Sequence, residues 1–146
     1  MKTLAPLGVA LALLGCVEPP PPATPAANVR VEVPEAVIAA HAAELPLSLY
    51  VRRTPGTLAN RGILLATICE PGAALATVYV WRPESPSEQV EAWIEPSYAD
   101  DPNTPCEITP EPLRRTRIVA GPTGRPIASA PLAPGGRATL VLADAP

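Results

Sequence analysis

Short runs of alternating apolar and polar residues, separated by proline and glycine, extend through most of the chain. In residues 29–33 three valines alternate with Arg30 and Glu32, which places the valines on one face of an extended strand. The run 63–69 is continuously apolar instead, as expected for a strand that is covered on both faces. The same reasoning predicts further strands at residues 45–53, 75–82, 115–120, 127–130 and 137–143.

The segments between these runs contain the residues that favour turns. Proline and glycine stand together at Pro55-Gly56, Pro71-Gly72 and Pro134-Gly135. About seven or eight short strands separated by turns predict an all-β domain, a small antiparallel β-sandwich or barrel. Residues 124–142, in which a Pro-Gly turn leads into an alternating strand, resemble the closing hairpin of immunoglobulin-like or transthyretin-like modules. The expected fold is therefore a small antiparallel β-sandwich of this kind.

Residues 34–45 allow two interpretations. The segment is rich in alanine, Pro34 suits the first position of a helix, and Val37, Ile38, His41 and Leu45 would then share one helical face. The segment could equally form an edge strand and a loop. One short helix near 34–45 is therefore compatible with the all-β prediction.

Residues 85–96 are ambiguous as well. Ser85 and Glu88 have the spacing of a capping box, and Val90 and Trp93 then follow at helical spacing. Read as a strand, the same segment places Val90, Ala92 and Ile94 on one face and Glu91, Trp93 and Glu95 on the other. Pro96 ends the segment after few residues, which favours the strand.

The N-terminus has the features of an export signal. Lys2 precedes an apolar run of about eleven residues, 4–14, whereas a membrane-spanning helix needs ~20. The sequence Leu13-Leu14-Gly15-Cys16 that follows resembles the lipobox of bacterial lipoproteins. This resemblance implies a signal peptide at 1–15, cleavage before Cys16, diacylglycerol on the sulfur of Cys16, and a further acyl chain such as palmitate on the new amino terminus. Two or three acyl chains anchor a protein stably in a membrane.

A proline-rich tether is predicted at residues 16–28, followed by a single β-sandwich domain at 29–146. Four consecutive prolines at 19–22 favour polyproline II, which at ~3.1 Å per residue could hold the domain roughly 30 Å from the bilayer. Val17 stands where an aspartate favours the inner membrane in enteric bacteria. The outer membrane is therefore the expected location.

The chain contains three cysteines, and an odd number in an exported protein leaves one to explain. If Cys16 carries lipid, Cys69 and Cys106 remain, and an oxidising compartment allows them to form a disulfide. Two cysteines and one histidine lack the ligand spacing of a zinc site.

Composition and net charge limit the number of domains and the classes of function that the chain can have. The chain of 146 residues contains 22 prolines and no phenylalanine, enough for one domain with a modest core. A net charge of -3 gives the chain as a whole no basic excess of the kind that nucleic-acid binding requires. Between Arg82 and Arg114 there are eight acidic residues and no basic one. This stretch is interpreted as a solvated surface, with a cation- or partner-binding face as the alternative.

The sequence shows no arrangement typical of an active site. His41 is the only histidine and has no acidic residue closer than Glu35 or Glu44, and no hydrolase motif occurs. Asp100, Asp101 and Asn103 could supply oxygen ligands to calcium, but the spacing of an EF-hand is missing. No other metal site and no cofactor is expected.

Three aromatic residues have two possible roles. Tyr79, Trp81 and Trp93 could form a platform on which sugars stack. Because the chain has so few aromatic residues, a place in the core is favoured.

The expected function is that of a membrane-anchored, non-catalytic bacterial lipoprotein that binds or scaffolds an unknown protein or glycan of the cell envelope. Two alternatives stay open: a carbohydrate- or calcium-binding module, and an accessory lipoprotein of a secretion system such as the type VI system.

Overall fold

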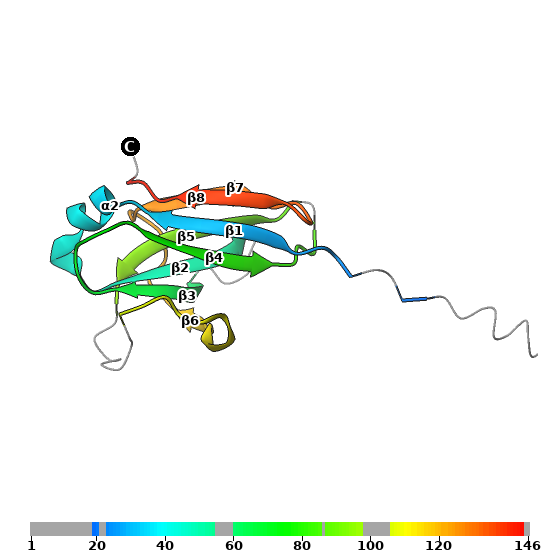
Figure 1. The fold of residues 1–146 in the computed structure, drawn as a ribbon, viewed down its shortest axis with the longest axis horizontal. Coiled ribbons are helices and arrows are strands. Elements are labelled where there is room, and N and C mark those ends of the chain that lie inside the picture. The colour runs from blue at the N-terminus through cyan, green and yellow to red at the C-terminus, as the bar shows by residue number, and fades with distance from the viewer. Residues whose placement is uncertain (1–18, 21–22, 55–59, 86, 98–105, 145–146) are drawn as a thin grey trace, which may run out of the picture.

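A computed structural model describes residues 19–20, 23–54, 60–85, 87–97 and 106–144 of the chain. Within these residues two β-sheets pack face to face, which confirms the prediction of a small all-β sandwich (Figure 1). The three-stranded sheet has the order β4-β1-β8 and the five-stranded sheet the order β6-β3-β2-β5-β7. The strands are β1 (Ala27–Val33), β2 (Leu47–Thr54), β3 (Arg61–Ile68), β4 (Leu75–Trp81), β5 (Gln89–Pro96), β6 (Thr116–Ile118), β7 (Ile127–Pro131) and β8 (Arg137–Val141).

The C-terminal part differs from the predicted closing hairpin. β7 and β8 follow each other in the chain but belong to different sheets, so the turn that contains Gly135 leads from one sheet to the other. β8 lies parallel to β1, whereas the other strand pairs are antiparallel. The sandwich is therefore antiparallel except at this pair, whose direction the sequence pattern did not indicate. Because β1 and β8 lie at opposite ends of the sequence, no hairpin turn fixes their relative direction.

The two ambiguous segments are resolved. Residues 34–45 form the helical alternative, with α2 (Glu35–Ala40) and a 3-10 turn η1 (Ala42–Glu44). Val37 and Ile38 are buried, so the short helix covers one end of the sandwich (Figure 1). The segment near Trp93 forms β5, as the strand interpretation predicted. A second 3-10 turn, η2 (Glu111–Leu113), precedes β6.

Among the described residues, no helix is long and apolar enough to cross a membrane.

The main core lies between the two sheets and follows the predicted alternation. Val29, Val31 and Val33 of β1 are fully buried, and they face Leu47 and Leu49 of β2 in the same apolar cluster. Burying each of these side chains stabilises the fold by about 1.5–3 kcal/mol.

A second, smaller core covers the outer face of the five-stranded sheet. It contains Tyr50, Leu64, Trp93 and Val119. Gly62 of β3 makes room for it, because a Cβ atom at this position would lie 3.0 Å from Cη2 of Trp93. The five-stranded sheet is thus partly covered on both faces, which explains why so many residues of β2, β3 and β5 are buried.

Candidate functional site

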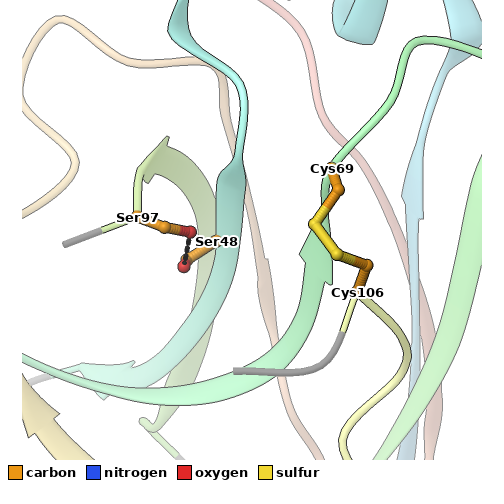
Figure 2. The surroundings of a disulfide bond; sticks show 4 residues. All are labelled: Ser48, Cys69, Ser97 and Cys106. Carbon is orange, nitrogen blue, oxygen red and sulfur yellow. Dashed lines mark hydrogen bonds between the residues drawn. A yellow bond between two sulfur atoms is a disulfide. The ribbon is translucent and has the colours of Figure 1, made fainter. Parts of the chain in front are cut away.

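The disulfide is the covalent link that sequence analysis anticipated. Cys69 follows β3 and is bonded to Cys106, with 5.5 Å between the two Cα atoms (Figure 2). The chain after Cys106 then runs along the edge of β3. The amide of Thr67 donates to the carbonyl of Glu107 over 3.0 Å, and the amide of Thr109 donates to the carbonyl of Leu65 over 2.8 Å. The disulfide therefore fixes the start of a segment that extends the five-stranded sheet.

A pair of hydroxyl groups lies near the disulfide. The Oγ atoms of Ser48 and Ser97 are 2.6 Å apart (Figure 2), and the amide of Ser97 donates to the carbonyl of Pro46 over 2.8 Å. Ser48 is 3% exposed. These contacts join the start of β2 to the end of β5, and the side-chain hydrogen bonds of His41 go elsewhere. In the part of the chain that the structure describes, the two hydroxyl groups are therefore not combined with a base.

His41 lies at the centre of a charged cluster at the helical end of the sandwich. Its Nδ1 is 2.8 Å from Oε2 of Glu44, and its Nε2 is 2.8 Å from Oδ1 of Asp144. Arg125 binds both carboxylate oxygens of Glu44 over 2.8 and 3.0 Å and donates through Nε to the carbonyl of Ile94. Of these partners only Glu44 lies near His41 in the sequence, whereas Asp144 and Arg125 lie far away along the chain and could not be identified from it.

Within this cluster His41 and Glu44 stabilise each other's charge. The hydrogen bonds to Asp144 and then Glu44 raise the pKa of His41 above its ordinary value. The hydrogen bonds from Arg125 and His41 lower the pKa of Glu44 to about 2. Because each ring nitrogen faces a carboxylate, the charged imidazolium satisfies both contacts as a donor. Neither nitrogen is then available as a base. His41, Glu44, Asp144 and Arg125 instead form a charged contact, here called the clasp, that joins η1 to the C-terminal segment.

The clasp predicts a pH-dependent contribution to stability. A raised pKa of His41 stabilises the fold fully below about pH 6.5, and this contribution is lost as the pH rises through the raised pKa. The contribution of Glu44 is present above its ordinary pKa and is lost only as the pH falls through about 2. At pH 5.5 we expect His41→Gln to lower the free energy of unfolding by about 1 kcal/mol. At pH 8.5 the difference between variant and wild type should be smaller than at pH 5.5. Urea unfolding at the two pH values measures this, and a difference that is equal at both would contradict the clasp.

The aromatic residues belong to the interior, as favoured above. Tyr79 and Trp81 are each 8% exposed and Trp93 is fully buried. Burial raises the pKa of Tyr79 to about 12. The guanidinium of Arg53 covers the ring of Trp81 at 3.5 Å from its centroid. These three rings consequently offer no open face on which a sugar could stack.

Two buried glutamates were not anticipated as special positions. Glu95 is 2% exposed, and its carboxylate accepts hydrogen bonds from the indole Nε1 of Trp93 at 2.9 Å and from the amides of Ala120 at 3.1 Å and Gly121 at 3.0 Å. Glu88 similarly accepts from the indole of Trp81 at 3.1 Å. The alternation of β5 places Trp93 and Glu95 on the same face, which is the signal that could have revealed the first pair.

Among the described residues, two surface hollows are large enough to receive a ligand. One, of about 380 Å³, lies on the outer face of the three-stranded sheet, between Asn28 and Arg30 of β1, Val78 of β4, and Arg137 and Thr139 of β8.

The other hollow, of about 430 Å³, lies beside the disulfide. Ile38 and Leu75 contribute apolar walls to it, Glu70 and Glu107 contribute charge, and Thr67 also lines it. In the described part of the chain, Oγ1 of Thr67 is the buried side-chain polar atom without a hydrogen-bond partner.

The remaining predicted site residues lie outside the described residues. This holds for Cys16 and for the calcium candidates Asp100, Asp101 and Asn103. Within the described ranges, no group of three or more histidine, cysteine, aspartate or glutamate side chains is placed to hold a metal ion.

The comparisons with known proteins add no relative. No protein-family model matches the chain, and no curated protein and no solved structure matches it significantly.

Proposed function

We propose that the chain is a bacterial lipoprotein, anchored by lipid on Cys16, whose β-sandwich binds or scaffolds a component of the cell envelope without catalysing a reaction. The observation that carries this proposal is the Cys69–Cys106 disulfide. It uses two of the three cysteines and leaves Cys16, which follows Leu13-Leu14-Gly15 directly behind an apolar signal-like run. A disulfide is also typical of proteins that have left the cytoplasm.

The start of the folded domain supports an anchored arrangement. β1 begins at Ala27, only eleven residues after Cys16 in the sequence. The carbonyl of Pro25 accepts a hydrogen bond from the amide of Gly135 over 3.2 Å, so the ordered contacts begin close to the proline-rich segment. A lipid on Cys16 would therefore hold the domain near a membrane surface. Val17 after the cysteine favours the outer membrane.

The chemistry of the described residues supports binding rather than catalysis. The single histidine contacts two carboxylates at once, which suits a structural contact better than proton transfer. The outer face of the three-stranded sheet, in contrast, combines the side chains of Arg30, Arg137 and Thr139 with the exposed Val78 and Val141. A mixed surface of charged, polar and apolar groups is typical of sites for transient partners.

Lipidation is tested by growing cells that express the chain with a clickable fatty acid. We expect the wild type to be labelled and Cys16→Ser to lose essentially all label, since the thioether and the new amino terminus both depend on Cys16. The matched control is Cys69→Ser/Cys106→Ser, which removes the other two cysteines and should retain the label per molecule of protein. Equal labelling of wild type and Cys16→Ser would refute the anchor.

A further inference from the structure

Charge is distributed unevenly between the two ends of the sandwich. We call the end where β1 begins the tether end, and the end covered by α2 the helix end; Figure 1 shows them at opposite sides of the molecule. Ala27, the first residue of β1, pairs with Trp81, the last residue of β4. Arg53 stacks on the ring of Trp81, so the end of β2 lies at the tether end too.

The tether end is rich in arginine. Arg82 follows β4 directly, and Arg137 of β8 pairs with Asn28 of β1. Arg61 begins β3, which pairs antiparallel with β2, so it lies at the same end of the sheet as the end of β2. Arg61, Arg82 and Arg137 are exposed and form no ion pair with any residue that the structure describes.

Acidic side chains do little to neutralise these arginines. Glu84 is 80% exposed and reaches Arg53 only at 3.8 Å. Glu88 is buried and accepts hydrogen bonds from the indole of Trp81 and the amide of Glu84. Glu91 forms an ion pair with Arg52 over 2.7 Å. The exposed charge of the tether end is therefore positive.

The helix end has the opposite sign. Glu35 lies on α2, Glu44 and Asp144 flank His41, and Glu70 and Glu107 each follow a cysteine of the disulfide. Arg125 and His41 neutralise only part of this charge. An anionic surface would consequently attract the tether end and repel the helix end.

We propose that the tether end docks on an anionic phospholipid surface, so that the helix end and the disulfide point away from the membrane. This proposal rests on the anchoring of Cys16 argued above. Nine residue steps separate Cys16 from Pro25, a reach of about 28 Å at ~3.1 Å per residue. A tether of this length keeps the domain at an effective concentration on the order of millimolar, so a weak attraction is sufficient. The attraction acts within about 8 Å at physiological ionic strength, which places the exposed arginines against the lipid headgroups.

Vesicle sedimentation with the mature chain that carries Cys16→Ser tests the docking without the lipid. We expect it to bind vesicles of phosphatidylglycerol and phosphatidylcholine, to ignore vesicles of phosphatidylcholine alone, and to dissociate at high salt. Each arginine near an anionic surface contributes about fivefold to partitioning, so Arg61→Gln/Arg82→Gln should weaken binding roughly 25-fold.

The matched control removes the same charge elsewhere. Arg115 follows η2 and is exposed, so Arg115→Gln should change binding less than about twofold, whereas Arg61→Gln alone should weaken it about fivefold. Circular dichroism checks that both variants are folded. Equal losses in the two variants, or no preference for anionic vesicles, would overturn the docking. Neither result would affect the fatty-acid labelling of Cys16, so the two proposals fail separately.

Discussion

Replacing both cysteines of the disulfide, in Cys69→Ser/Cys106→Ser, is expected to lower the free energy of unfolding by about 3–4 kcal/mol. The two residues are 37 positions apart, and the loop that they close contains β4 and β5, one strand from each sheet. Without the bond, the conformational entropy of the unfolded chain increases, because the two ends of the loop can separate, and the folded state becomes less stable relative to it. A loss of this size is a large part of the stability of a domain of 146 residues, typically 5–15 kcal/mol.

Urea unfolding measures the effect, with Cys16→Ser in every protein so that no third thiol interferes. The protein that retains Cys69 and Cys106 should lose a similar amount of stability when a reductant is added. The stability of Cys69→Ser/Cys106→Ser should not change with the reductant. Hydrogen exchange should increase first at the amides of Thr67 and Thr109, which pair the chain after Cys106 with β3. A loss below about 1 kcal/mol would show that the sheet contacts alone hold this segment.

The strands could be predicted because each has an apolar face with a period of two. In β1 the alternation of Val29, Val31 and Val33 with polar residues identified both the strand and its buried side, since one face of a sheet must meet the core. The disulfide could be predicted from cysteine parity combined with the lipobox. These conclusions depend on local patterns, which the sequence displays directly.

Contacts between distant segments were not predictable in the same way. The parallel pairing of β8 with β1 joins strands from opposite ends of the sequence, and neither strand carries a local signal for direction. Asp144 approaches His41 only because the segment after β8 returns to the helix end. A lone histidine in an alanine-rich segment gave no indication that two carboxylates would hold it.

The burial of Glu95 could not be predicted from the sequence either. Alternation placed it correctly beside Trp93 on one face of β5, but the pattern suggested a solvated face because Glu91 and Glu95 are charged. The segment that begins at Val119 covers this face and supplies two amide donors, so the carboxylate becomes buried. A charged residue in an alternating strand therefore identifies the face but not whether a later segment covers it.

The burial of Glu95 leads to a second large expected effect. Its Oε2 accepts hydrogen bonds from the indole of Trp93 and the amide of Gly121, and its Oε1 accepts one from the amide of Ala120. Removing the carboxylate in Glu95→Ala leaves the indole and the amide of Gly121 as buried donors without a partner. Each such donor costs about 1–3 kcal/mol, so we expect a total loss of about 2–6 kcal/mol.

The variant Glu95→Gln separates hydrogen bonding from packing, because it keeps the shape of the side chain. Its single amide oxygen can accept the hydrogen bonds of Trp93 and Gly121, but its NH2 group then faces the amide of Ala120, which is also a donor. We expect an intermediate loss of about 1–3 kcal/mol in urea unfolding, measured by the tryptophan fluorescence to which Trp81 and Trp93 both contribute. The matched control is Glu107→Gln, an exposed carboxylate that should change stability by less than about 0.5 kcal/mol. If Glu95→Gln proves as stable as this control, the carboxylate does not organise the segment that covers β5.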